Sequence, residues 1–182
     1  MTNEEIREKL FSKKSPDRKK AAKTIAKNKL KEFGDELYAQ YLEEKKDKRT
    51  WETQCEMIKT LGLIDYKQAI ENIYEIVKEN QPHDAITLYA ALAYIRLKRK
   101  SINDGKVALE LLDFGRISII EGVLMVLAID KMIPDNEIIE KIIKKCWNLH
   151  QHEDMDVGIG DCRKYLAIAC ANWNINLTQN PH

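Results

Sequence analysis

The segment ISIIEGVLMVLAI, residues 117–129, decides the fold class of this chain. It is the longest apolar run in the sequence, but it is shorter than the roughly 20 residues that a membrane-spanning helix needs. Glu121 also lies inside it. A run of this kind predicts a helix that is buried on all sides. We therefore expect an all-α protein without a membrane-spanning segment.

Helical spacing extends in both directions from this segment. Apolar residues recur at i, i+3, i+4 and i+7, whereas no Asn-Gly or Asp-Gly turn joins two alternating runs. Asp84 and the pair Pro134-Asp135 are residue types that begin helices. These signals predict a short helix at 3–12, a last helix at 160–173 and, between them, helical pairs at 16–31 and 34–47, 50–62 and 66–80, 84–100 and 105–113, and 116–131 and 135–152.

An internal period appears when the first helices of the pairs are superimposed. A small residue recurs at steps of 33, 35 and 32 residues, and the second helices repeat at steps of 33, 37 and 32. One hairpin cannot bury both of its faces, so such units must stack and share a core. The alternative is a plain helix bundle with coincidental spacing. The recurring positions are Ala22, Cys55, Ala90 and Gly122 in the first helices, and Leu37/Tyr41, Ile70/Tyr74, Val107/Leu111 and Ile139/Ile143 in the second.

Two short motifs make the chain resemble the HEAT-like repeat family, particularly its short bacterial form. DRKKAA at residues 17–22 is similar to the start of a HEAT-like unit, and KTLG at residues 59–62 is similar to the end of its first helix. The resemblance covers most of residues 16–171, by motif in the first two units and by length and pattern in the others. It implies a right-handed α-solenoid of four to five stacked helical hairpins, whose second helices line a concave binding face. It implies no chemistry.

The composition indicates one globular domain in a reducing compartment. Hydrophobic residues make up 44% of the 182 residues and charged residues 32%, and no Pro-rich or Gly/Ser-rich linker divides the chain. The four cysteines show no CxxC pairing, and the N-terminus lacks the apolar core of a signal peptide. We expect a single cytoplasmic repeat domain over residues 1–182, with a polar N-terminal cap at about 1–33 and a frayed tail at about 174–182.

The sequence contains no recognisable catalytic or metal-binding motif. HQHEDMD at residues 150–156 is neither H-E-x-x-H nor a calcium loop, and GIGD at residues 158–161 lacks the preceding strand of a dinucleotide site. No nucleophile, base and orienting group converge. Trp51, Trp147 and Trp173 fall on apolar helical faces, which favours core positions over base stacking. We expect no catalysis, no bound metal and no cofactor.

The segment from Lys9 to Lys31 is strongly basic, with ten Lys or Arg residues and a single acid. Along the chain, the net charge changes from +5 over residues 1–50 to −4 over residues 104–182. Three interpretations stay open: a solvated cap helix, a surface for an acidic protein, or a surface for nucleic acid. The lack of aromatic residues between Phe11 and Phe33 argues against nucleic acid. The candidate basic patch is Arg18, Lys19, Lys20, Lys23 and Lys27.

A repeat scaffold without chemistry predicts a protein-binding module, such as a scaffold, an adaptor or an immunity protein that neutralises a toxin. Tyrosine suits its contact surface because it combines apolar area with a polar tip. The alternative role for the two equivalent tyrosines, Tyr41 and Tyr74, is packing between hairpins. The alternative function is nucleic-acid binding, with a remote relation to HEAT-like DNA alkylation-repair glycosylases. The candidate groove residues, all in predicted second helices, are Tyr38, Tyr41, Lys45, Tyr74 and Lys78.

Overall fold

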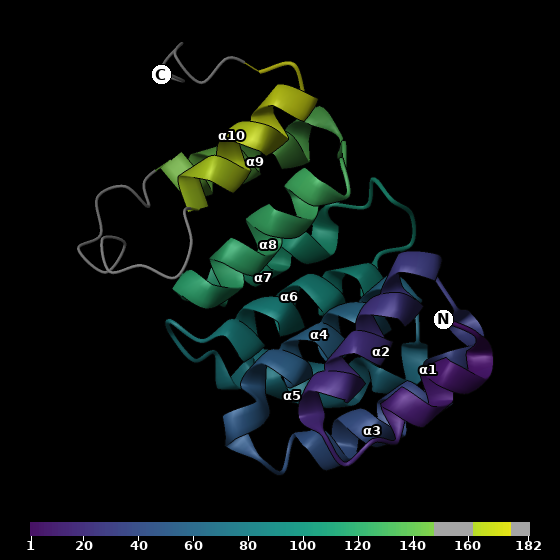
Figure 1. Cartoon of the computed structure of the whole chain (residues 1–182). Helices are drawn as coiled ribbons and strands as arrows, with labels where there is room; N and C mark the ends of the chain where they lie inside the picture. Colours follow the sequence, from purple (N-terminus) through teal and green to yellow (C-terminus); the bar gives the residue numbers. More distant parts are fainter. Residues whose placement is uncertain (148–161, 176–182) are drawn as a thin grey trace.

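The computed structural model describes residues 1–147 and 162–175 of the chain. Helix makes up 77% of these residues, and no strand occurs among them. Ten α-helices within the described ranges pack against one another (Figure 1). The all-α prediction is therefore confirmed.

The helices lie close to their predicted positions. A short helix, α1 (Asn3–Leu10), precedes the pairs, and α10 (Cys162–Asn172) follows them. The predicted helix at 66–80 begins later, at Ile70, because residues 67–69 form a 3-10 turn. The paired helices are α2 (Ser15–Asn28) and α3 (Gly34–Glu44), α4 (Trp51–Leu63) and α5 (Ile70–Glu79), α6 (Ala85–Lys98) and α7 (Lys106–Phe114), and α8 (Ile117–Ile129) and α9 (Asn136–Trp147).

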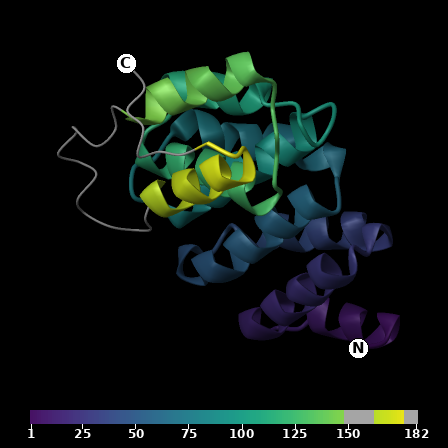
Figure 2. The same cartoon turned by 90° about the horizontal axis from the view of Figure 1, so that it is seen from above.

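The even-numbered helices form a row in which each contacts the next, from α2 through α4, α6 and α8 to α10. We call this row the even-helix layer. Helices α3, α5 and α7 pack on the helix that follows each of them in the chain, α4, α6 and α8. Helix α1 covers α2 and α3, and α9 packs on α7. Figure 1 shows the row rising from α2 near the N-terminus to α10, and Figure 2 shows the N-terminus and α9 on opposite sides of the molecule.

Small residues let neighbouring even helices approach closely. Gly122 of α8 faces α6, where an added Cβ would lie 2.3 Å from the carbonyl oxygen of Leu88. Gly62 of α4 faces α6 from the other side, and a Cβ there would lie 2.8 Å from the Cα of Ala93. Helix α6 is therefore in near-backbone contact with both of its neighbours. The recurring small positions of the first helices are all buried, namely Ala22, Cys55, Ala90 and Gly122.

One hydrophobic core extends through the described chain, from Ile6 of α1 to Trp173 after α10. In α8 every residue from Ser118 to Ala128 is buried, which confirms the prediction for most of the apolar segment at 117–129, whereas Ile129 at its end is 57% exposed. None of the described helices is both long and apolar enough to cross a membrane.

Two carboxylates are held by arginine: Glu44, which is buried at the end of α3, and Asp130, whose side chain is 10% exposed. Asp130, at the end of α8, accepts hydrogen bonds from Nε and Nη2 of Arg96 at 3.0 and 2.6 Å, and Arg99 lies 2.8 Å away. Glu44 accepts from Arg18. Burial is the largest single influence and acts to raise the pKa of each carboxyl group, but the hydrogen bonds and arginine charges around it together outweigh burial, and both pKa values are lowered. Both carboxylates are therefore charged at neutral pH.

Candidate functional site

A surface hollow lies on the even-helix layer where α2, α4 and α6 meet. Its volume is about 300 Å³. We call it the even-helix hollow. It is therefore formed by the first helices of the predicted pairs, whereas the sequence analysis expected a binding face on the second helices. The described residues that line it are Lys19, Lys23, Trp51, Glu52, Cys55, Glu56 and Tyr89.

Trp51 lines the hollow and is 48% exposed. It is the first residue of α4, one turn before the buried Cys55. Trp51 and Cys55 share an apolar face of α4. Neighbouring side chains cover this face at Cys55 but leave it open at Trp51, at the N-terminal end of the helix. The predicted core position is therefore wrong for Trp51. It is confirmed for Trp173, which is buried and donates from Nε1 to the carbonyl oxygen of Met132 at 2.7 Å. The side chain of Trp147 lies outside the described residues.

Apart from Lys23, the polar groups that line the hollow are either uncharged or paired. Burial raises the pKa of the Cys55 thiol to about 12, so the thiol is protonated at neutral pH and is a poor nucleophile. Glu56 is buried and pairs with Nζ of Lys59 at 2.8 Å. Glu52 pairs with Lys19, whose hydrogen bond and charge lower the pKa of that carboxyl group. This arrangement offers contacts to a ligand, and the pKa values of the Cys55 thiol and the Glu52 carboxyl group are both shifted away from neutrality, which does not suit proton transfer.

Tyr89 of α6 joins the hollow to the rest of the even-helix layer. Burial is the main cause that raises the pKa of its hydroxyl group, and nearby Cys55, Tyr165 and Glu121 add to the effect. Those three residues belong to α4, α10 and α8. Groups on three other even helices therefore act electrostatically on Tyr89.

The predicted basic patch divides into two parts. Arg18 pairs with the buried Glu44 and donates to the carbonyl oxygen of Ser12 at 2.6 Å, while Lys19 pairs with Glu52. These two cations are neutralised within the chain. The remaining three are exposed and form no ion pair with a carboxylate in residues 1–147 or 162–175, namely Lys20, Lys23 and Lys27.

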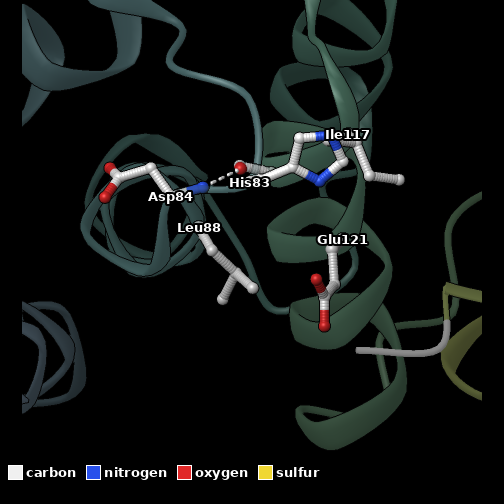
Figure 3. Close-up of a pocket in the computed structure, with 6 residues that line it drawn as sticks. His83, Asp84, Leu88, Ile117 and Glu121 are labelled. Atoms are coloured by element: carbon white, nitrogen blue, oxygen red, sulfur yellow. Dashed lines mark hydrogen bonds between the residues drawn. The ribbon is translucent and has the colours of Figure 1, made fainter. Parts of the chain in front are cut away.

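A second, smaller hollow lies between the beginnings of α6 and α8 (Figure 3). Its volume of about 10 Å³ leaves room for one water molecule at most. The carboxylate of Asp84 points away from His83 and caps α6, accepting from the backbone N–H of Thr87 at 2.7 Å. The backbone N–H of Asp84 donates to the Ser118 hydroxyl at 2.8 Å. This site is a helix start and is too small for an organic ligand. Its lining is His83, Asp84, Leu88, Ile117, Ser118 and Glu121.

The tyrosines and lysines predicted for a groove on the second helices occupy different environments. Tyr41 is 1% exposed, because its ring packs in the core between helices, and burial raises the pKa of its hydroxyl group. It is therefore unavailable to a partner, and packing between helices is its observed role. Tyr38 is half-buried, lies 5.5 Å from Tyr66 between ring centroids and accepts from Asn72. Lys45 donates to the Asn72 side-chain oxygen at 3.2 Å.

Tyr74 and Lys78 lie on α5 and are engaged with their neighbours. The Tyr74 ring stacks on Tyr94 with 5.1 Å between centroids, and Nζ of Lys78 lies 5.2 Å from the Tyr74 centroid. Lys78 also pairs with Glu75 at 2.6 Å. The structure thus brings Tyr38 and Lys45 together through Asn72, and Tyr74 and Lys78 together on α5, but it does not bring either pair to the even-helix hollow.

Several sequence-based expectations fall outside the described residues. These are the segments at 150–156 and 158–161, and the tail from residue 176 onward. Among residues 1–147 and 162–175, no cluster of His, Cys, Asp and Glu could hold a metal ion.

Sequence reasoning missed Glu52, Glu56 and Tyr89 as site residues. One signal could have found two of them: Lys23, Glu56 and Tyr89 follow each other at steps of 33 residues, which is the repeat period. Residues one period apart in stacked helices lie side by side.

No protein-family model matches the chain, and neither a curated protein nor a solved structure matches it.

Proposed function

We propose that this chain is a non-enzymatic protein-binding module that receives a partner on the even-helix layer, at the even-helix hollow. The observation that carries the proposal is Trp51, a large aromatic side chain that remains 48% exposed beside that hollow. Tryptophan is enriched among the residues that dominate protein–protein affinity, particularly beside a cavity that a partner can fill. The pairing of the nearby charges and the protonated Cys55 thiol favour binding over catalysis.

We also propose that the helices form a HEAT-like solenoid. The row of even helices, with α3, α5 and α7 each packed on the even helix that follows it, is consistent with a HEAT-like solenoid of stacked hairpins. A scaffold, an adaptor or an immunity protein against a toxin would each use such a surface. The four cysteines are buried and form no disulfide with one another, which suits the reducing cytoplasm.

A photo-reactive phenylalanine analogue in place of Trp51 tests the proposal in cells. The matched control carries the same analogue in place of Phe114, which ends α7 and is 47% exposed. We expect a discrete protein adduct from position 51, competed by the unmodified chain and absent from position 114. Equal adducts from both positions, or no adduct from position 51, would contradict the proposal.

Nucleic-acid binding is the second candidate function, and one observation favours it. Trp51 lies in the same hollow as Lys19 and Lys23, so an aromatic ring for base stacking is present beside the basic helix after all. In the cross-linking experiment, an adduct at position 51 that nuclease removes would replace the protein-binding proposal with this one.

A further inference from the structure

Three exposed lysines follow one stripe of α2 beside the even-helix hollow. Lys20, Lys23 and Lys27 are at i, i+3 and i+7, so consecutive members are neighbours, with about 5–6 Å between their Cβ atoms. None of the three pairs with a carboxylate in the described parts of the chain, although Lys19 beside them pairs with Glu52. The stripe therefore keeps its full charge and attracts a ligand with several anionic groups.

The hollow itself has room for one large side chain. Its volume of about 300 Å³ is at the lower end of the range for ligand pockets, which is about 300–1,000 Å³. Trp51 and Tyr89 supply aromatic surface, and the protonated Cys55 behaves as a small apolar residue. A leucine or phenylalanine side chain suits this space better than a charged group does.

Carboxylates on α4 distinguish between anionic ligands. Glu52 and Glu56 line the hollow directly across from α2. A nucleic-acid strand places a phosphate at every nucleotide, and some of those phosphates would lie against these carboxylates. An extended peptide can instead direct its backbone N–H groups to Glu52 and its acidic side chains to the lysines. The charge pattern therefore favours a peptide.

We propose that the site selects an acidic segment of a partner protein that carries one large apolar residue. The apolar side chain fills the even-helix hollow against Trp51, and flanking Asp or Glu residues contact Lys20, Lys23 and Lys27. This inference rests on the proposed function and adds the chemistry of the partner to it.

Fluorescence anisotropy with the whole chain and three labelled probes tests the proposal. The probes are a peptide of glutamates around one central leucine, the same peptide with serine in place of the leucine, and a single-stranded oligonucleotide of equal charge. We expect the leucine peptide to bind about tenfold more tightly than the serine peptide, since a buried leucine contributes at least that much. Binding should weaken as salt increases. Equal affinity for the two peptides, or tighter binding of the oligonucleotide, would overturn the proposal.

Two pairs of variants locate the binding site, and circular dichroism verifies that each is folded. Trp51→Ala should abolish the preference for leucine, whereas Phe114→Ala, a change at an equally exposed ring, should preserve it. Lys20→Glu with Lys23→Glu should weaken binding at least about tenfold. Lys98→Glu with Lys100→Glu makes the same charge change at exposed positions outside the hollow and should weaken binding far less. If the folded Trp51→Ala chain keeps the preference, the proposal is wrong.

The cross-linking experiment distinguishes the protein-binding function from the preference for an acidic segment, because position 51 reports a protein partner of any charge. A specific protein adduct together with failure of both acidic peptides would leave the protein-binding function standing and reject the acidic segment. Absence of the adduct would reject both.

Discussion

Lys19 of α2 and Glu52 of α4 form an ion pair across the even-helix layer, and they are 33 positions apart, one repeat step. Arg96 of α6 and Asp130 at the end of α8 do the same at a separation of 34. Because stacked helices place equivalent positions side by side, the sequence period identifies lateral neighbours as well as repeated units. The Arg96–Asp130 pair is more buried than the Lys19–Glu52 pair. Its contribution to the free energy of unfolding can be measured.

Replacing Arg96 by methionine should destabilise the fold. The Arg96 side chain is 5% exposed, and its loss leaves the Asp130 side chain, which is 10% exposed, with Arg99 as its ion-pair partner among the described residues. Breaking a buried pair costs about 3–5 kcal/mol, and the retained Arg99 places the expected loss near about 2–3 kcal/mol. Urea denaturation gives the free energy of unfolding. Lys141→Met, which breaks an exposed pair with Glu137, should change the free energy of unfolding far less. Equal costs would contradict a buried role for Arg96.

Acid should destabilise the chain through the same carboxylates. The pKa values of Glu44 and Asp130 are lowered in the folded chain, so each carboxylate contributes stability that is fully present above its unfolded pKa of about 4. That stability is lost as the pH falls through the folded pKa. The free energy of unfolding should be nearly constant from about pH 7 to 5 and decline below that range. Asp130→Asn should decline less steeply than the parent chain, and parallel curves would show that Asp130 does not titrate in this way.

Gly122→Ala should also destabilise the fold, although alanine is the better helix former by about 1 kcal/mol. The added Cβ would lie 2.3 Å from the Leu88 carbonyl oxygen, a backbone atom that cannot move without shifting α6. Overpacking of this kind costs about 1–3 kcal/mol, so a net loss is expected. In Gly34→Ala the Cβ would instead meet the Tyr66 ring, a side chain that can turn. A thermal melt should therefore show a larger decrease in Tm for Gly122→Ala, and the opposite order would mean that α6 and α8 can separate easily.

Tyr41 should behave as a core residue. Removal of a fully buried aromatic ring costs about 3–5 kcal/mol, so Tyr41→Ala should strongly destabilise the fold. Tyr74→Ala should destabilise it less, because Tyr74 is half-buried. Tyr41→Phe retains the ring and should remain folded with its peptide binding intact. Chemical denaturation measures the stability of each variant, and the anisotropy assay measures its peptide binding. Loss of binding in a stable Tyr41→Phe chain would return this residue to a contact role.

Periodicity was sufficient to predict most of the fold, because helices whose apolar residues recur at three and four positions must bury that face. The positions of the helices and the burial of residues 118–128 follow from it. The pattern did not predict which helices pack most closely. Helix α3 packs on α4, the next helix in the chain, and Tyr41 of α3 is buried in the core.

The site was harder to predict because exposure at a helix end depends on the neighbouring helices. Trp51 shares a helical face with Cys55, and the sequence contains nothing that distinguishes the covered residue from the open one. The basic residues posed a similar difficulty. Arg18 and Lys20 are two positions apart, yet the first pairs with Glu44 and the second has no carboxylate partner within the described ranges. Long-range ion pairs decide which charges remain available to a ligand.

The glycine contacts on both sides of α6 have a mechanical consequence. Gly62 and Gly122 place α4, α6 and α8 in near-backbone contact, so these helices cannot slide past one another without steric overlap and should deform as one stiff block. Helix α2 meets α4 through hydrogen bonds, including one from the Thr60 hydroxyl to the Ala22 carbonyl oxygen at 3.3 Å, and such bonds can stretch. The even-helix hollow lies across this softer joint. Its width is therefore set by the tilt of α2, and a partner could adjust that width without disturbing the block.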